Sequence, residues 1–193
     1  MNDIEYFLKS KEKALNSLNK AICQNKLDLD IKEIINTINS KEEYFTSSCC
    51  SGRIVILELP DLGNKKKAKF LGKWHRDIQF NELIKATKIA KSGMIWLLAQ
   101  SPIIHVITRS YSLADKIIKI AIYSGFKNSG YKSTTSNIVV EICSTERLDS
   151  PIGNHGKLLV NNEHLKLLLE ISNNIINRSR KKLKKFEKNL NKL

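Results

Sequence analysis

Two serine–glycine pairs stand beside apolar runs of the strand type and could help to bind a ligand. Ser51-Gly52 precedes Arg53 and a long apolar run, and Ser129-Gly130 precedes a second such run. Glycine lets the backbone turn tightly and brings N–H groups close to a ligand, while the guanidinium fork of an arginine suits a carboxylate or a phosphate. The pairs therefore suggest a binding site for a polar or anionic group, although a plain turn of small residues also explains each of them.

A second set of candidates consists of titratable side chains in strand-like runs. His105 alternates with apolar residues in a run that ends at Arg109, and Glu141 lies in a later run. Histidine changes its charge near neutral pH and can accept a proton, but a structural, hydrogen-bonded histidine is the alternative. Cysteines such as Cys49 and Cys50 show no Cys-x-x-Cys spacing and no assignable base, so neither a zinc site nor a thiol nucleophile is predicted.

The chain is strongly basic, with a formal net charge of +14. Half of this charge comes from residues 178–193, which hold eight basic residues and one acidic residue. Residues 60–80 form a second basic cluster, interleaved with aromatic side chains. Such composition is typical of nucleic-acid binding, because cations contact phosphates and aromatic rings stack on unpaired bases. A solvated lysine surface around buried aromatic residues is the alternative, and an anionic membrane surface is a weaker one.

Hydrophobic periodicity predicts a single α+β domain over residues 1–193, with a central mixed β-sheet flanked by helices. The predicted helices are 3–23, 31–38, 81–91, 112–124 and 161–193. The predicted strands form a hairpin at 44–59 and continue at 94–99, 103–108 and 138–143, with loops at 60–80 and 145–157. The long C-terminal helix has an apolar seam of heptad spacing, and its basic end should project, pair with another helix or lie along RNA.

Local signals mark where these elements begin and end. Asp30 followed by Glu33 predicts a helix N-cap, Ser112 with Asp115 predicts a capping box, and Gly125 predicts a helix end. The order helix, strand, serine–glycine pair, strand occurs twice in the chain. An internal duplication would bring the two serine–glycine turns to related places in one sheet.

The sequence also argues against several classes of protein. No two glycines are separated by a single residue, so the dinucleotide-binding fingerprint is absent and a Rossmann-type fold is disfavoured. No apolar run approaches the roughly 20 residues that span a bilayer, and the acidic start is unlike a signal peptide. Four cysteines without a paired spacing fit a reduced protein. These features together predict a cytoplasmic location.

The segment 47–54, Ser-Ser-Cys-Cys-Ser-Gly-Arg-Ile, resembles the Ser-Ser-Cys-Ser-Gly-Arg-Ile segment of the tRNA wybutosine-synthesizing protein 3 family. Four further segments resemble the family in the same order and at matching spacing: Trp74-His75, 104–109, 125–130 and 140–146. The resemblance extends over roughly the whole chain. It departs from the family at Cys50, which is an extra cysteine, at Tyr131, where an aliphatic residue is usual, and around residues 26–28, where the family has Lys-Gly-Ser.

This resemblance implies a methyltransferase that uses S-adenosyl-L-methionine and does not have the Rossmann-type methyltransferase fold. The implied substrate is tRNA(Phe) that carries a demethylwyosine with an aminocarboxypropyl arm next to the anticodon. The methyl group would be placed on the N-4 nitrogen of the tricyclic base. A non-catalytic RNA-binding protein with a basic C-terminal arm is the alternative, because the composition supports it equally well.

The resemblance also suggests a role for each candidate residue. Ser51, Gly52, Arg53, Ser129 and Gly130 would hold the methionine carboxylate and the ribose of the cofactor. His105 and Arg109 would face the modified base, and either His105 or Glu141 could take a proton from it. The residues expected to contact the tRNA are Trp74, His75, Lys65, Lys66, Lys67, Arg180, Lys181 and Lys184.

Overall fold

The computed structural model describes residues 3–61, 63, 65–133 and 137–193, without the side chains of Asp3 and Lys65. Over these residues the chain forms five α-helices and nine strands, and its contacts divide it into two compact units. Unit 1 comprises residues up to 51, 102–145 and 180–193, and unit 2 comprises 52–101 and 146–179. Neither unit is a continuous stretch of chain, because each is assembled from segments that are distant in the sequence.

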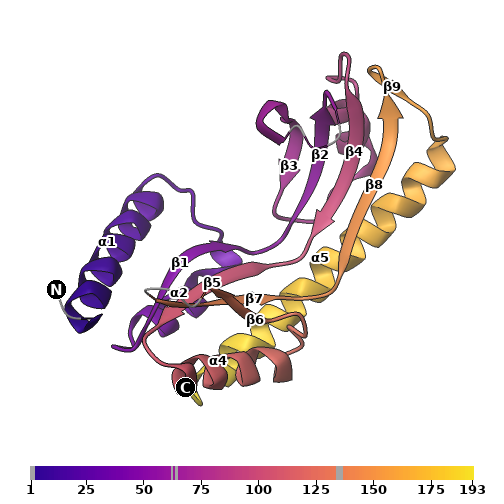
Figure 1. Ribbon diagram of the computed structural model, residues 1–193. Coiled ribbons are helices and arrows are strands. Elements are labelled where there is room, and N and C mark those ends of the chain that lie inside the picture. The colour runs from indigo at the N-terminus through magenta and orange to yellow at the C-terminus, as the bar shows by residue number, and fades with distance from the viewer. Residues whose placement is uncertain (1–2, 62, 64, 134–136) are drawn as a thin grey trace. The chain divides into compact units, whose positions relative to one another are not determined.

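Unit 1 is built on a four-stranded antiparallel sheet with the strand order β1-β5-β7-β6 (Figure 1). Its strands are β1 (Tyr44–Cys50), β5 (Ile103–Thr108), β6 (Gly130–Ser133) and β7 (Ile138–Cys143). Its helices are α1 (Asp3–Cys23), α2 (Lys32–Asn39), α4 (Tyr111–Tyr123) and the last turns of α5 (Asn162–Leu190). A 3-10 turn, η1 (Leu29–Ile31), precedes α2.

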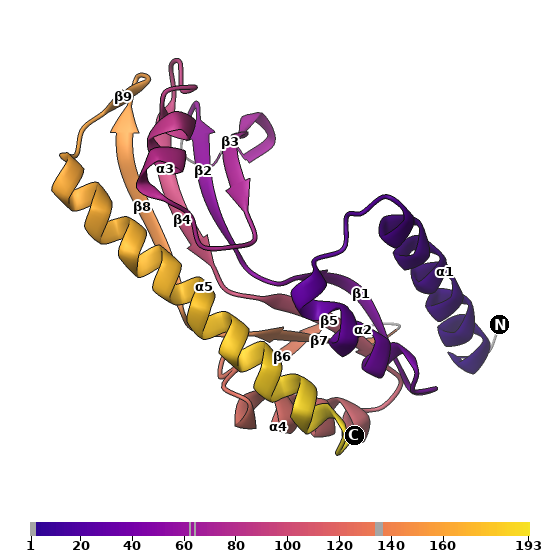
Figure 2. The same ribbon diagram turned by 180° about the vertical axis from the view of Figure 1, so that it is seen from behind.

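The two faces of this sheet differ in character. Ile104, Val106 and Val140 are fully buried and pack against residues of α2, α4 and the end of α5. Figure 2 shows these three helices on one side of the sheet. Side chains alternate between the faces of a strand, so the intervening residues, including His105 and Glu141, point to the opposite face. That face carries polar, partly exposed side chains, and it is the one on which chemistry can take place.

Unit 2 is built on a five-stranded antiparallel sheet with the order β3-β2-β4-β8-β9. Its strands are β2 (Arg53–Leu59), β3 (Lys69–Trp74), β4 (Met94–Gln100), β8 (Arg147–Asn154) and β9 (Lys157–Leu158). It also contains the 3-10 turn η2 (Lys65–Lys67), helix α3 (Phe80–Thr87) and the first part of α5. Ile54 and Ile56 of β2 pack with Leu83 of α3 and Leu165 of α5 in one apolar core.

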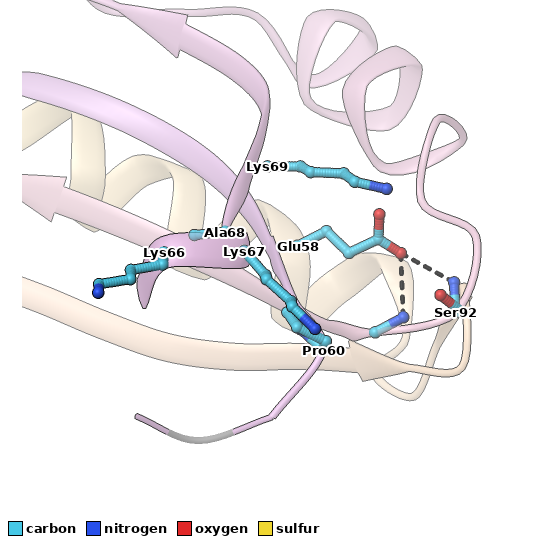
Figure 3. Close-up of a pocket in the computed structure, with 8 residues that line it drawn as sticks. Glu58, Pro60, Lys66, Lys67, Ala68, Lys69 and Ser92 are labelled. Atoms are coloured by element: carbon cyan, nitrogen blue, oxygen red, sulfur yellow. Dashed lines mark hydrogen bonds between the residues drawn. The ribbon is translucent and has the colours of Figure 1, made fainter. Parts of the chain in front are cut away.

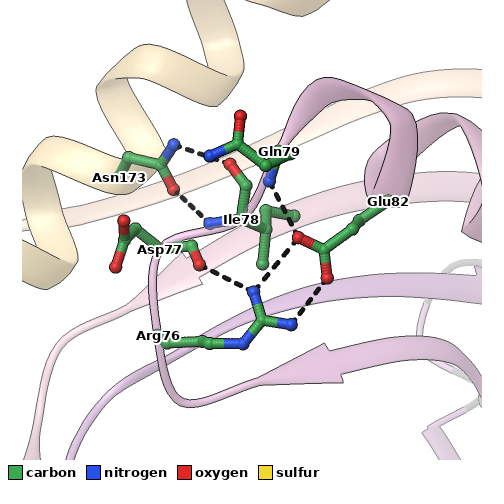
Figure 4. Close-up of polar contacts among 6 residues, drawn as sticks. All are labelled: Arg76, Asp77, Ile78, Gln79, Glu82 and Asn173. Carbon is green, nitrogen blue, oxygen red and sulfur yellow. Dashed lines mark hydrogen bonds and ion pairs between the residues drawn. The ribbon is translucent and has the colours of Figure 1, made fainter.

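A polar network fixes the segment that leads into α3 (Figure 4). The side chain of Asn173 on α5 accepts a hydrogen bond from the backbone N–H of Ile78 (2.9 Å) and donates one to its carbonyl (3.0 Å). Arg76 donates two hydrogen bonds to Glu82, at 2.6 and 3.1 Å, and Glu82 also accepts one from the backbone of Gln79. The first backbone N–H groups of a helix have no partner within the helix, and α3 is short. These contacts supply partners for backbone groups at and before its start.

The predicted α+β class is confirmed, and over the described residues both sheets are antiparallel, unlike a Rossmann fold. The prediction of a single central mixed sheet was wrong, because the strands divide between two sheets. The predicted hairpin at 44–59 was also wrong: β1 pairs with β5, whereas β2 pairs with β3 and β4. Gly52 precedes β2 and Gly130 begins β6, which belong to different sheets, so the duplication within one sheet is not found.

Several local predictions need correction. The predicted loops at 60–80 and 145–157 contain β3 and β8, which sit beside β2 and β4 because neighbouring strands supply partners that local patterning does not reveal. Asp30 is not the N-cap of α2, since the side chain of Asp30 pairs with Arg180 instead. Ser110, not Ser112, caps α4 by accepting a hydrogen bond from the N–H of Leu113.

The heptad seam of the C-terminal helix is buried along its length. Leu165, Leu169 and Ile176 belong to the core of unit 2, and Leu183 and Phe186 belong to the core of unit 1. The basic end of α5 is therefore held against its unit by an apolar stripe, and its lysines lie on the remaining faces. None of the described helices combines the length and the apolar character needed to cross a membrane.

Glu58 is a buried carboxylate in the core of unit 2, with 5% of its surface exposed. Its Oε1 accepts hydrogen bonds from the backbone N–H groups of Lys91, Ser92 and Gly93, at 2.8, 2.8 and 3.0 Å. Figure 3 shows the bond from Ser92. These three donors lower the pKa of Glu58 despite the opposing effect of burial. A cavity of about 380 Å³ beside it is lined by lysines, including Lys69, but the carboxylate itself serves to hold the turn before β4.

We expect Glu58→Gln to lower the free energy of unfolding at pH 7 by about 1–3 kcal/mol, since an amide cannot replace an anion that accepts three N–H groups. The depressed pKa means that this stabilisation is present above the unfolded-state pKa and is lost as pH falls through the folded-state pKa. The deficit of the variant should therefore shrink in acid. Urea denaturation from pH 7 to pH 3, with the exposed Glu12→Gln as control, measures it; a deficit that is independent of pH would contradict this role.

Candidate active site

Four residues form one row across the polar face of the unit 1 sheet. The strand register sets Ser48 opposite His105, His105 opposite Glu141, and Glu141 opposite Gly130. The Oγ of Ser48 lies 2.8 Å from Nδ1 of His105, and Nε2 of His105 lies 2.8 Å from Oε2 of Glu141. Lys132 of β6 contacts the same carboxylate oxygen at 3.3 Å. A hydrogen-bonded chain thus runs across all four strands.

The charge state of Glu141 decides how protons are arranged in this chain. The hydrogen bond from His105 lowers the pKa of Glu141, aided by Lys132 and opposed by partial burial. An ionised carboxylate can only accept, so Nε2 of His105 carries a proton and donates it. In the neutral imidazole the other nitrogen, Nδ1, is then an acceptor, and the hydroxyl of Ser48 donates to it. In that form of the ring, Nδ1 is the nitrogen that can accept a further proton.

A cavity of about 520 Å³ lies next to this row, between α1 and the sheet of unit 1. Its volume falls within the range of small-molecule sites, roughly 300–1,000 Å³. Its walls come from α1, the following loop, β1, Ile107 of β5 and Asn137. The lining residues are Ser10, Lys13, Ala14, Ser17, Leu18, Ala21, Lys26, Leu27, Asp28, Phe45, Thr46, Ser47, Ser48, Cys49, Ile107 and Asn137. Ser48 therefore belongs both to the hydrogen-bonded row and to the cavity wall.

Aromatic contacts hold α1 over the edge of the sheet. Phe7 of α1 is buried and meets Phe45 of β1 edge to face, with ring centroids 5.1 Å apart. The guanidinium of Arg109 lies over the ring of Phe7, 5.4 Å from its centroid. Arg109 was expected to face the modified base together with His105. Arg109 comes directly after the end of β5, four residues after His105 and so about 13 Å away along a strand, and its observed contact is with α1.

The first serine–glycine pair has partners within each unit. In unit 1, the backbone N–H and the hydroxyl of Ser51 both donate to Asp28, each at 3.0 Å. In unit 2, the carbonyl of Gly52 lies 3.0 Å from Nδ1 of His75, and Gly52 has the positive φ of 95° that favours glycine. Arg53 donates from Nε to the side chain of Gln100 at 2.8 Å, and its terminal nitrogens have no hydrogen-bond partner in the part of unit 2 that the structure describes.

The two residues of the second pair, Ser129-Gly130, have different surroundings. The hydroxyl of Ser129 donates to the carbonyl of Phe126 at 2.7 Å and accepts from the N–H of Cys143 at 3.3 Å, which ties the start of β6 to the end of β7. At Gly130 an added Cβ would meet no atom within 4 Å. Gly130 therefore leaves open space on the polar face beside Glu141, whereas Ser129 serves the fold.

The residues expected to contact RNA are distributed unevenly. Trp74 packs against the core of unit 2, as in the alternative interpretation, while Lys66 and Lys67 are exposed. The side chain of Lys65 lies outside the described residues. On α5, Arg180 pairs with Asp30 at 3.0 Å, and Lys181 and Lys184 are exposed. The exposed lysines remain suitable for phosphates, and Trp74 is better explained as a core residue.

Two members of the hydrogen-bonded chain, Ser48 and Lys132, were not predicted from the sequence. Ser48 stands in the segment that carries the family resemblance, but its partner His105 is 57 residues away. Only the pairing of β1 with β5 brings the two together. Because side chains alternate along a strand, the sequence could have shown which residues share a face of the sheet. It could not have shown which residues of neighbouring strands lie opposite each other.

Comparison with known proteins agrees with the resemblance. The family model described as Methyltransferase TYW3 matches residues 9–192. A protein of Pyrococcus abyssi (strain GE5 / Orsay), named tRNA(Phe) 7-((3-amino-3-carboxypropyl)-4-demethylwyosine(37)-N(4))-methyltransferase 1, is 42% identical over 194 residues, which cover 100% of both chains. A protein of Methanocaldococcus jannaschii whose name differs only in lacking the final numeral is 38% identical over 189 residues, covering 97% of this chain and 98% of its own length.

Solved structures show the same fold. The PH1069 protein from Pyrococcus horikoshii superposes with a TM-score of 0.92 at 41% identity, with 98% of each chain covered. A hypothetical protein from Aeropyrum pernix superposes with a TM-score of 0.74 at 26% identity, with 86% of this chain and 98% of that chain covered. The match to the family model and these full-length similarities show that this chain belongs to the Methyltransferase TYW3 family.

Proposed function

We propose that this chain methylates the N-4 nitrogen of an aminocarboxypropyl-demethylwyosine base in tRNA(Phe), with S-adenosyl-L-methionine as the methyl donor. The names of its relatives describe this reaction. The structural observation that supports it is the row of Ser48, His105 and Glu141, which places a proton acceptor beside a cavity. A tRNA substrate fits a cytoplasmic location.

S-adenosyl-L-methionine offers the protein a carboxylate, an ammonium and a ribose through which it can be held. The space left open at Gly130, beside Glu141, would accommodate part of such a molecule. Considered separately in unit 2, the terminal nitrogens of Arg53 offer the geometry that a carboxylate requires, and Arg53 stays a proposed contact of the donor on that ground alone. We keep Ser51, Gly52 and Ser129 as residues that shape the two serine–glycine turns, because their own polar atoms are used within the protein.

Methyl transfer from a sulfonium proceeds by in-line displacement, and the donor supplies the electrophilic methyl group. The protein must align the acceptor nitrogen and free its lone pair, and alignment alone contributes up to about 7–11 kcal/mol in favourable cases. His105 accepts the proton at Nδ1, and Glu141 holds the ring and stabilises the imidazolium that forms. Glu141 itself is a poor base here, since its lowered pKa reflects the contacts that favour its anion.

Removing the proton acceptor should slow chemistry more than binding. We expect His105→Gln to lower the single-turnover rate of methyl transfer by about 10²–10⁴-fold. Glu141→Gln should lower it by about 10–150-fold, which corresponds to the 1.5–3 kcal/mol of a charged hydrogen bond. Labelled methyl donor and precursor tRNA measure both rates, with the exposed Glu170→Gln as control. Wild-type protein that binds this tRNA but transfers no label would be a mere RNA-binding protein.

Arg53 can be tested by binding of the donor alone. Arg53→Ala should weaken the calorimetric affinity for S-adenosyl-L-methionine by about 10–150-fold, because a charge-assisted hydrogen bond is lost. Lys85→Ala removes an exposed cation of the same unit and should leave the affinity unchanged. An unaltered affinity of a folded Arg53→Ala variant would remove Arg53 from this role.

The exposed lysines should contribute through counterion release. We expect the double variants Lys66→Gln/Lys67→Gln and Lys181→Gln/Lys184→Gln each to weaken tRNA binding and to flatten its salt dependence by roughly 1–2 in the logarithmic slope. Lys116→Gln/Lys119→Gln on α4 is a matched control, with the same spacing as the tail pair on an exposed helix face. If the slope stays the same for the tail pair, the basic end of α5 is a structural helix only.

A further inference from the structure

The hydroxyl of Ser48 occupies the position between the imidazole of His105 and the cavity. Ser48 is exposed and lines the cavity, whereas His105 is not part of the cavity wall among the described residues. The two nitrogens of the imidazole are both engaged, Nδ1 with Ser48 and Nε2 with Glu141. A proton from a molecule in the cavity therefore meets Ser48 before it meets the ring.

A bulge in β1 creates this arrangement. Thr46 pairs with Val106, and a regular ladder would place Ser47 opposite His105. The register shifts between Thr46 and Ser48, so Ser48 takes that position instead. Bulges commonly re-aim one side chain next to a site, and this one turns a hydroxyl toward the histidine.

We propose that Ser48 is a catalytic residue that relays the proton from the acceptor nitrogen of the substrate to His105. This inference rests on the proposed function, and it names the group that touches the reacting atoms. The N–H bond of the base breaks as its proton passes to Oγ of Ser48, and the O–H proton of Ser48 passes to Nδ1 of His105. The electron pair of the broken N–H bond stays on the acceptor nitrogen, ready for the methyl group.

The ionisable groups of the cavity wall are less suited to this step, and of the wall's hydroxyls Ser48 is the one hydrogen-bonded to His105 in the part of the chain that the structure describes. Burial raises the pKa of the Cys49 thiol to about 11, with smaller contributions from Asp28 and Cys50, so the thiol stays protonated. Lys13 and Lys26 are ammonium donors with no acceptor capacity. Asp28 already accepts two hydrogen bonds from Ser51. A hydroxyl, by contrast, accepts from one partner while it donates to another.

The first test needs no substrate. Nitrogen-15 NMR of the imidazole should show His105 protonated at Nε2 and unprotonated at Nδ1 when the ring is neutral. Ser48→Ala should shift the Nδ1 resonance, because the hydrogen bond that it accepts is lost. A proton on Nδ1 of the neutral ring, or an Nδ1 resonance that does not respond to Ser48→Ala, would overturn the relay.

The second test follows the protons during the reaction. Ser48→Ala should lower the single-turnover rate by at least about tenfold and up to about 10⁴-fold, while donor and tRNA affinities stay within about twofold. In mixtures of H₂O and D₂O the wild-type rate should curve downward, as expected for two protons in flight. Ser48→Thr restores a hydroxyl and should recover part of the rate, and the exposed Ser112→Ala is the control.

The outcomes separate this inference from the proposed function. A rate loss below tenfold in folded Ser48→Ala, or a linear isotope dependence in the wild type, would overturn the relay and leave the methyltransferase reaction standing. Absence of methyl transfer by the wild type would instead overturn the proposed function, and the relay, which depends on it, would fall as well. The NMR arm then still reports whether the hydrogen bonds of His105 are as described.

Discussion

The hydrogen bond between His105 and Glu141 is the interaction on which the candidate site depends. It joins neighbouring strands, β5 and β7, at directly opposed positions, so its 2.8 Å length is set by the ladder that pairs those strands. The anion fixes which nitrogen of the ring carries the proton, and this choice passes to Ser48 on the far side of the ring. The charge of Glu141 thus sets the direction of each hydrogen bond from Glu141 to Ser48. The pairing of the strands holds these residues in place.

The same sheet explains why polar groups can gather there at little cost in stability. The helix-covered face takes the apolar residues of each strand, with Val106 and Val140 fully buried, and leaves the alternate positions to the other face. Helix α1, anchored by Phe7, shelters part of that polar face and encloses the cavity without filling it. Hydrogen bonding is stronger in such a half-sheltered setting than in open water. Fold and chemistry therefore use opposite sides of one layer.

Much of the local structure could be predicted from residue patterns. The spacing of apolar residues predicted α1 over residues 3–23 and the buried seam of α5, because helical periodicity is a property of neighbouring residues. Strands β5 and β7 were predicted because each is a short run of apolar residues, which is also a property of neighbouring residues. The strands β3 and β8 were missed, since lysine, glycine and proline in them disfavour a strand until a partner strand is present. The predicted hairpin between β1 and β2 was wrong, because two strands that are close in the sequence need not pair with each other.

By itself the sequence determined the α+β class, the family, the two basic clusters and the identity of His105 and Glu141 as candidates, since each of these follows from residue types or from order along the chain. Tertiary structure alone decided that these two residues touch, that Ser48 and Lys132 join them, and that Trp74 belongs to a core. Register between strands that are distant in sequence is set by the packing of the whole layer against its helices. A change of register by one residue would turn every side chain to the other face, so no local pattern could have revealed the row.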